Sequence, residues 1–434
     1  LTVHCVKALD TGDGPTLYAG GEFQSCGNVR AAGIAARDID GWRAIAPRMG
    51  YVDIHELAAF DDGSGAVILA GGYVRLEGAP TGLPTWLSRT GIWRLSNGEA
   101  QLIAPVWNGV NRPLRVKAIV PFESNLYVAG NFAYIENTRV ESIACWNGQY
   151  WAPLAGGVSN PENVPGLYGW VNALAIYDDG GGSALYAGGR FTRAGGVPVQ
   201  GIAKWDGLQW HAVGTLDSDD CVVLALATAD FGEGLRLFAG GDIATVGGVA
   251  VSNLAAWDGQ QWHDVGGGVG NGVGAVYALK AAMIENAPQL FVGGSFGSAG
   301  PLQTEDIARW DGAAWHAVGG GMSTTSSGTV YSIEVFDDGD GPAIWLGGDF
   351  ESTSAGVSLN IARFGCVRDD IAGDLNCDGS VNAYDIDAFV LALQDAARYA
   401  ETYPDCRIQN ADTNADGAVN NFDIDPFVML LAGD

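Results

Sequence analysis

An apolar segment that ends in a pair of small residues, usually Gly-Gly, occurs seven times along the chain. It reads Leu-Tyr-Ala-Gly-Gly-Glu-Phe over 17–23 and Leu-Phe-Val-Gly-Gly-Ser-Phe over 290–296. The second small residue is a glycine each time, at Gly21, Gly72, Gly130, Gly189, Gly241, Gly294 and Gly348. Successive copies therefore lie 51, 58, 59, 52, 53 and 54 residues apart. Such regular spacing predicts a repeat architecture.

Each repeat has the pattern of four short strands. An apolar strand such as 171–177 precedes the Gly-Gly segment, and a strand such as 202–205 follows it. An Asp206-Gly207 turn then leads to a last strand that begins at Trp210. Four-stranded antiparallel units of roughly 50 residues, repeated four to eight times, are typical of β-propellers. The 65 glycines suit many tight turns. We therefore predict an all-β, seven-bladed β-propeller over residues 1–365.

The repeat resembles a known sequence type. Leu-Tyr-x-Gly-Gly-x-Phe followed by Ile-Ala-x-Trp-Asp-Gly-x-x-Trp is similar to the repeats of secreted bacterial propellers of planctomycete type, and distantly to kelch blades. The resemblance covers about residues 1–365. It implies the fold and says nearly nothing about function.

The seventh repeat lacks the usual outer strand. Its strands are expected near 330–336, 343–347 and 361–364, and the chain then continues into Gly365-Cys366. Three outcomes are open: a three-stranded blade, a blade that borrows 367–371, or an open edge that accepts a strand from another chain.

Two nearly identical loops follow, at 374–385 and 412–423. Both read Asp-x-Asn-x-Asp-Gly-x-Val-Asn-x-x-Asp, which is the EF-hand pattern with Asp in place of the final Glu. Ca²⁺ takes six to eight oxygen ligands, and alternate positions of a tight loop supply them. The predicted ligands of two Ca²⁺ ions are Asp374, Asn376, Asp378, Ser380 (carbonyl), Asn382 and Asp385 in the first loop, and Asp412, Asn414, Asp416, Ala418 (carbonyl), Asn420 and Asp423 in the second.

Each loop leads into an apolar, helix-like segment, at 386–393 and 424–431. Tandem loop-helix units resemble dockerin type I domains, and this resemblance implies calcium-dependent binding to a cohesin-like partner. We assign residues 366–434 to this small α-helical domain. The resemblance places the partner contacts at Ala383-Tyr384 and Asn421-Phe422. These pairs differ from the Ser-Thr type pairs of cellulosomal dockerins, so a different cohesin-like partner, or another copy of the chain, is expected.

Charge and cysteine content limit the possible partners and the cellular location of the protein. The net charge of −28 argues against nucleic acid, which is bound through basic patches. No apolar run approaches the length of a membrane span. The seven cysteines include no Cys-x-x-Cys pair and favour a secreted protein with disulfides. The candidate bonds are Cys377–Cys406 and Cys5–Cys366.

The propeller itself offers only weak candidate sites. Recurrent pairs such as Trp205/Trp210 fit blade packing, with an exposed glycan-binding ring as the alternative. Three histidines, at 211, 263 and 316, occupy equivalent positions and do not converge on one site. Asp53, His55 and Glu56 share an inner strand, where they either face a channel or start a glycosidase-like site. No catalytic residue is assigned.

Three functions remain open on the sequence. The first is a secreted, non-enzymatic protein whose propeller binds protein or glycan and whose C-terminal module docks through calcium. The second is a polysaccharide-active enzyme carried by that module. The third is a self-assembling surface subunit.

Overall fold

The computed structural model describes residues 2–12, 14–27, 29–38, 41–45, 49–61, 63, 65–76, 90–96, 98–108, 114–160, 169–214, 216, 221–270, 274–284, 287–318, 328–338, 342–353, 356–357, 360–365, 372–375, 381–403, 408–414 and 418–432. The chain forms two compact units. They comprise Leu1–Asp340 with Ile344–Arg363, and Gly341–Ala343 with Phe364–Asp434.

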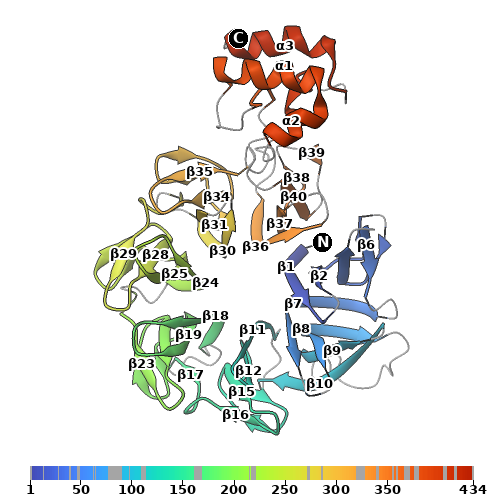
Figure 1. Ribbon diagram of the computed structural model, residues 1–434. Helices are drawn as coiled ribbons and strands as arrows, with labels where there is room; N and C mark the ends of the chain where they lie inside the picture. Colours follow the sequence, from blue (N-terminus) through green and yellow to red (C-terminus); the bar gives the residue numbers. More distant parts are fainter. Residues whose placement is uncertain are drawn as a thin grey trace. The chain divides into compact units, whose positions relative to one another are not determined.

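The first unit consists of seven antiparallel sheets, here called blades, arranged in a ring (Figure 1). Blades 1 to 6 each have four strands, listed blade by blade from the innermost strand outward: β1 (Thr2–Asp10), β2 (Pro15–Glu22), β5 (Ile34–Asp38), β6 (Gly41–Ala44); β7 (Met49–Asp61), β8 (Ala66–Leu76), β9 (Thr90–Ser96), β10 (Glu99–Trp107); β11 (Val116–Phe122), β12 (Asn125–Gly130), β15 (Ile143–Trp146), β16 (Trp151–Pro153); β18 (Trp170–Asp178), β19 (Ser183–Arg190), β22 (Ile202–Trp205), β23 (Trp210–Ala212); β24 (Val222–Asp230), β25 (Leu235–Asp242), β28 (Leu254–Trp257), β29 (Trp262–Asp264); β30 (Ala275–Ile284), β31 (Ala287–Ser295), β34 (Ile307–Trp310), β35 (Trp315–Ala317). In the described residues, blade 7 has three strands, β36 (Thr329–Asp337), β37 (Pro342–Asp349) and β40 (Ile361–Gly365).

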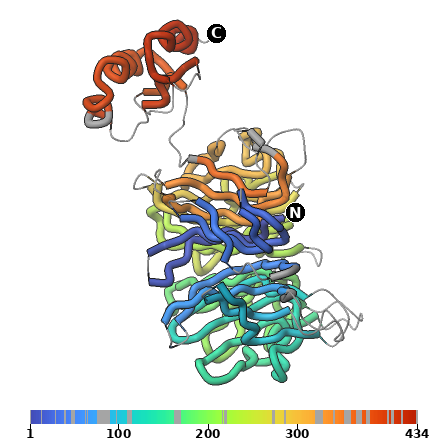
Figure 2. The backbone as a smooth tube through the Cα atoms, turned by 90° about the vertical axis from the view of Figure 1, so that its right-hand side faces the viewer, coloured from blue at the N-terminus to red at the C-terminus, as the bar shows by residue number. Residues whose placement is uncertain are grey.

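The ring closes between its first and last blades. Innermost strands contact one another in the order β1, β7, β11, β18, β24, β30 and β36, and β36 contacts β1. Figure 2 shows the first strands, in dark blue, beside the orange strands of blade 7. The Val6 amide also donates to Ser332 Oγ at 2.9 Å across this junction. The predicted seven-bladed propeller is thus confirmed, with a three-stranded last blade. Residues 367–371 lie outside the described ones.

The Gly-Gly pairs allow two different close approaches. A Cβ built on Gly20, the first glycine of its pair, would lie 2.8 Å from Ile54 of the next blade. A Cβ on Gly21 would collide with the Thr2 carbonyl oxygen of its own blade. The same two contacts recur around the ring, and Gly347 meets Val3 where blade 7 joins blade 1. The first glycine therefore sets the spacing between blades, and the second sets the spacing between strands.

A short hairpin fills the segment between the second and third strands of a blade, where the sequence suggested only a variable loop. The hairpin strands are β3 (Ser25–Cys26) with β4 (Val29–Arg30), β13 (Tyr134–Ile135) with β14 (Thr138–Arg139), β20 (Arg193–Ala194) with β21 (Val197–Pro198), β26 (Thr245–Val246) with β27 (Val249–Ala250), β32 (Ser298–Ala299) with β33 (Leu302–Gln303), and β38 (Ser352–Thr353) with β39 (Gly356–Val357). Several pair with the preceding blade's chain: β13 with β10, and β20 with β17 (Val158–Ser159). The hairpins therefore link neighbouring blades.

In every blade except blade 2, where this position lies outside the described residues, the residue just before the third strand adopts a left-handed backbone. Asn253, Asp306 and Asn360 do so with φ of 65°, 63° and 65°. Each side chain accepts a hydrogen bond from a backbone N–H of its own blade, at 3.2, 2.9 and 3.3 Å respectively. Asn and Asp suit this conformation because their short polar side chains bond locally. Asp306, however, is 8 % exposed, and burial raises its pKa to about 6.

Asp306→Asn is therefore expected to stabilise the propeller at neutral pH. The pKa of Asp306 is higher in the folded than in the unfolded state. The free energy of unfolding therefore falls as pH rises from about 4 through 6 and Asp306 ionises. Asn keeps the accepting oxygen without the charge. The gain at pH 7 should be on the order of 1–3 kcal/mol and should vanish near pH 4. Urea unfolding at both pH values measures it.

Asn253→Asp is the matched control, because it places a carboxylate at the same position of the neighbouring blade. It should destabilise the chain more at pH 7 than at pH 4. Equal effects of either substitution at the two pH values would contradict this explanation.

The second unit is helical in its described residues. It contains the 3₁₀ turns η2 (Ala383–Asp385), η3 (Ile408–Ala411) and η4 (Asn421–Asp423), and the helices α1 (Ile386–Gln394), α2 (Ala396–Thr402) and α3 (Ile424–Ala432). The two helices expected from the sequence are α1 and α3. Phe389 and Phe427 occupy the same position in them and stack with ring centroids 4.0 Å apart. This stack joins the two loop-helix repeats through one core.

Candidate functional site

The last residue of each calcium loop folds back over its own loop. Asp385 accepts hydrogen bonds from the N–H groups of Leu375 (2.8 Å) and Asn382 (2.9 Å). Asp423 accepts them from Asn414 (3.1 Å) and Asn420 (2.8 Å). Both carboxylates are fully buried. The contact from Asn382 or Asn420 is the same in both loops, whereas the other donor is the second residue of the first loop and the third residue of the second.

The start of each loop is also held in place. Asp374 is fully buried, and the Asn410 amide donates to its carbonyl oxygen at 2.8 Å. In the second loop the Thr413 hydroxyl donates to the Asp423 carbonyl at 2.6 Å. The side chains predicted to bind the metal are those of Asp and Asn, and their oxygen atoms are the hard ligands that Ca²⁺ prefers. Residues 367–434 carry 14 acidic groups against 3 arginines. Buried carboxylates in so acidic a unit fit a divalent cation.

Six of the predicted calcium-loop and disulfide positions fall outside the described residues, as does Cys366. They are Asn376, Asp378, Ser380, Asp416, Cys377 and Cys406. Among the described ligands, Asn382 and Asn420 each cap the turn that follows. Their side-chain oxygens accept from the N–H groups of Tyr384 and Phe422, both at 2.9 Å.

All four predicted partner-contact residues are exposed. Tyr384 and Phe422 are each 80 % exposed, and Ala383 and Asn421 are exposed beside them. The helices add to these surfaces at equivalent positions. The exposed apolar residues at equivalent positions are Tyr384, Ile386 and Val390 in the first repeat, and Phe422, Ile424 and Val428 in the second. We call them the first and second apolar faces.

The predicted Cys5–Cys366 disulfide is wrong. Cys5 is a free, buried thiol on β1. Its side chain packs between blades 1 and 2, where a Cβ on Gly20 would lie 2.7 Å from the sulfur. The remaining described cysteines, Cys26, Cys145 and Cys221, are also free. Packing against the next blade therefore decides the environment of Cys5.

A β-bulge near the start of the innermost strand shapes the centre of the ring. The pairing of the first two strands shifts between Val3 and Cys5 in blade 1, and between Ile54 and Glu56 in blade 2. The skipped residue faces the ring centre, since bulges re-aim side chains. Counted by repeat position, these residues are His4, His55, Lys117, Asn172, Leu224, Tyr277 and Tyr331, and all of them line one cavity.

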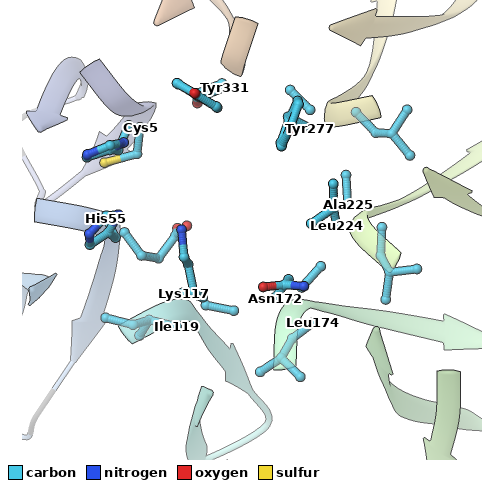
Figure 3. A pocket seen from close by; sticks show the side chains of 18 of the residues that line it. Cys5, His55, Lys117, Ile119, Asn172, Leu174, Leu224, Ala225, Tyr277 and Tyr331 are labelled. Carbon is cyan, nitrogen blue, oxygen red and sulfur yellow. The ribbon is translucent and has the colours of Figure 1, made fainter. Parts of the chain in front are cut away.

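This cavity has a volume of about 720 Å³ and two chemically different walls. Figure 3 shows His55 and Lys117 on one side of the opening, and Leu224 and Ala225 on the opposite side. The chain has four lysines, and three of them, Lys7, Lys117 and Lys280, line the cavity. Although the protein is strongly acidic, three of its four lysine side chains therefore line the cavity at the centre of the ring.

Two of these lysines are ion-paired. Lys7 Nζ lies 3.1 Å from Glu56 Oε1, and Lys280 pairs with Glu334. The Glu56 carboxylate raises the pKa of Lys7, whereas burial raises the pKa of Glu56 itself. Lys117 makes no ion pair with any described residue. Burial, together with the Arg115 guanidinium, lowers the pKa of Lys117 to about 8.

Asp53 and Glu56 have different partners in the channel. Asp53 lies between two imidazoles, with Oδ1 3.2 Å from His4 Nε2 and Oδ2 3.3 Å from His55 Nε2. The two rings stack with centroids 4.2 Å apart. Burial lowers the pKa of His55 to about 4. His55 and Glu56 therefore face the channel, while a glycosidase-type carboxylate pair stays a prediction. The sequence had not singled out His4.

The repeated tryptophans serve blade packing. Trp151, Trp210, Trp262 and Trp315 are at most 8 % exposed. Trp210 and Trp262 donate their indole N–H groups to carbonyl oxygens of the preceding blade, at 2.8 and 2.9 Å. The packing interpretation is thus confirmed for these residues. The three equivalent histidines each pair with an Asp of their own hairpin, as His263 does with Asp258 at 2.7 Å.

A family model for the dockerin type I domain matches residues 372–426. No curated protein matches the chain. Solved structures with similar folds include the extracellular domain of the hybrid two-component system BT4673 from B. thetaiotaomicron. It is 12 % identical with a TM-score of 0.48, and the match covers 83 % of this chain but 38 % of that one. YCF48 bound to D1 peptide is 12 % identical with a TM-score of 0.44, covering 84 % and 92 % of the two chains. At these identities the likeness concerns the fold alone.

Proposed function

We propose that this protein is a secreted docking protein, in which the C-terminal unit binds two Ca²⁺ ions and attaches the propeller to a cohesin-like partner. The observation that carries the proposal is the match of residues 372–426 to a dockerin type I domain. The two loops in that segment repeat the same ligand pattern and share one closing contact.

The residues that would hold calcium are those of the two loops. The predicted ligands among the described residues are Asp374, Asn382 and Asp385 in the first loop, and Asp412, Asn414, Ala418 (carbonyl), Asn420 and Asp423 in the second. Bound Ca²⁺ would supply the counter-charge that lets these carboxylates share a small space. Because each loop leads directly into a helix, the loop's closing Asp fixes where that helix begins. Calcium would thereby set the shape of the surface that a partner meets.

The first and second apolar faces are the surface proposed for docking. A largely exposed aromatic next to exposed aliphatic side chains is unusual for a solvated surface, and aromatic residues dominate binding energy at interfaces. The two faces carry the same types of residue at the same repeat positions. Either face can therefore offer a similar contact to one partner.

Substituting the exposed aromatics is expected to remove docking. The partner probe is a panel of purified cohesin domains immobilised on a sensor surface. Tyr384→Ala and Phe422→Ala should each leave one intact face and weaken binding by only a few-fold. The double variant should lose at least about 30-fold in affinity, as for interface hot spots. Binding should also vanish in EDTA.

Leu208→Ala is the matched control, because Leu208 is an exposed apolar residue of the propeller (86 %). It should bind like the unaltered chain. If no cohesin binds, light scattering with and without Ca²⁺ tests docking between copies of the chain. A calcium-dependent rise in mass would support a second copy as the partner. Absence of both cohesin binding and a calcium-dependent mass change would overturn the proposal.

The secreted location is part of the same proposal. It is supported by the dockerin match, because dockerin modules are typical of extracellular and cell-surface proteins. No helix within the described residues is both long and apolar enough to cross a membrane. For the propeller, the proposed role is interaction through its surfaces or its cavity, with protein or glycan as the ligand.

A further inference from the structure

The contact between Asp53 and its two histidines differs from every other His–Asp contact in the described residues. Three surface histidines lie 2.6 or 2.7 Å from their carboxylates, as hydrogen-bonded pairs do. In the channel the corresponding separations are 3.2 and 3.3 Å. Two ligand atoms that bind one tetrahedral ion at 2.0–2.1 Å lie roughly 3.3 Å apart. Each separation in the channel is close to this value, and the two histidines approach different oxygens of the same carboxylate.

Burial makes the arrangement costly without an ion. The His55 side chain is 2 % exposed, and neither of its ring nitrogens has a hydrogen-bond partner. Asp53 Oδ1 is likewise buried without one. Each such buried polar atom has lost its hydration without gaining a hydrogen bond in return. A cation between the imidazoles and the carboxylate would satisfy the unpaired atoms.

The donor set also selects a type of metal. His4, Asp53 and His55 offer one ligand atom each, all within 4.8 Å of one another, and form the one such group among the described residues. Imidazole nitrogen with a single carboxylate suits Zn²⁺ and similar transition metals rather than Ca²⁺. We propose that His4, Asp53 and His55 bind one divalent transition-metal ion, with Zn²⁺ as the reference case, in the channel wall.

The proposed site opens toward the cavity. The His4 side chain is 20 % exposed, and His4 and His55 both line the cavity. Three protein ligands leave a fourth position for water or another ligand, as in catalytic zinc sites. Lys117 also lines the cavity, so an anion is the expected type of additional ligand. This proposal is independent of calcium docking, because its residues all belong to blades 1 and 2.

The test is competitive titration of Zn²⁺ into the full chain against a chromophoric chelator, with the calcium loops saturated by Ca²⁺. The unaltered chain should bind one Zn²⁺. His55→Ala and His4→Gln should each weaken this binding by about 100-fold or more, since each removes one of three ligands. Co²⁺ should give the intense visible absorption of a four-coordinate site, and this absorption should be lost in both variants.

His263→Ala is the matched control and should bind Zn²⁺ like the unaltered chain. Tryptophan fluorescence during urea unfolding checks that each variant is folded. His4→Gln is the safer of the two because its side chain is partly exposed. Absence of Zn²⁺ binding to the unaltered chain would overturn the proposal. Unchanged binding in His4→Gln would overturn it as well, because the ion would then sit elsewhere.

Discussion

Removal of calcium with excess EDTA is expected to unfold the C-terminal unit and leave the propeller folded. Three carboxylates of this unit, Asp374, Asp385 and Asp423, are fully buried. The unit has an excess of 11 acidic groups, 14 against 3, over residues 367–434. Without divalent cations, repulsion among these groups opposes a small core, and small metal-binding domains commonly lose their fold. The expected loss is the whole cooperative transition of this unit.

The chain contains its own two reporters for this experiment. All 14 tryptophans lie between Trp42 and Trp345, so tryptophan fluorescence reports on the propeller. In the described residues the α-helices lie between 386 and 432, so circular dichroism at 222 nm reports mainly on the C-terminal unit. EDTA should reduce the helical signal and leave the fluorescence unchanged. A helical signal that EDTA does not alter would contradict the prediction.

Replacement of Asp338 is expected to open the junction between blades 7 and 1. The Asp338 side chain is fully buried and accepts hydrogen bonds from two arginines. Arg363 of blade 7 donates at 2.8 and 3.2 Å, and Arg37 of blade 1 donates at 2.9 and 3.2 Å. Both guanidiniums also lie over the Trp345 ring: the Cζ atom is 5.0 Å from the ring centroid for Arg37 and 6.0 Å for Arg363. One carboxylate thus holds two blades together where the ring closes.

Asp338→Asn should destabilise the propeller by about 3–5 kcal/mol, the usual cost of breaking a buried ion pair from one side. The two arginines would then face each other without a counter-charge. Burial opposes ionisation of Asp338, but the arginines outweigh it and lower its pKa. Its contribution is therefore present at neutral pH and lost as pH falls through the folded pKa. Urea unfolding followed by tryptophan fluorescence measures the change.

Asp179→Asn is the matched control, because Asp179 has the same place in blade 4. It bonds to Lys204 and Tyr186 of its own blade and is 18 % exposed. Its loss should cost clearly less than the loss of Asp338, since it joins no other blade through these contacts. Equal destabilisation by the two substitutions would show that the junction has no special role.

Much of the propeller could be predicted because the same sequence pattern recurs in every blade. The seven Gly-Gly segments gave the number of blades, and the Asp-Gly pairs marked turns such as the one at Gly207, whose φ is 96°. The hairpin after the second strand was missed, although Gly247-Gly248 between two valine-containing segments carried a signal for it. The sequence analysis had not singled out Asp338. Its inward orientation depends on Arg37, 301 residues away.

Of the candidate sites, too, one could be predicted from the sequence and the other could not. The calcium loops could be read from the sequence because all their ligands lie within twelve residues. The channel could not, because its residues come from seven strands and are aimed inward by β-bulges that leave no local signal. Aligning the repeats on their Gly-Gly pairs would have placed His4 and His55 at the same position, 51 residues apart. That alignment is the signal that could have found the histidine pair.

Calorimetric titration of Ca²⁺ into the chelated full chain tests the calcium-dependent docking module most directly. Two ions should bind per chain, with the helical signal at 222 nm rising as they do. Asp385→Ala and Asp423→Ala should each remove one of the two sites. Absence of binding, or two sites retained in both variants, would contradict the account.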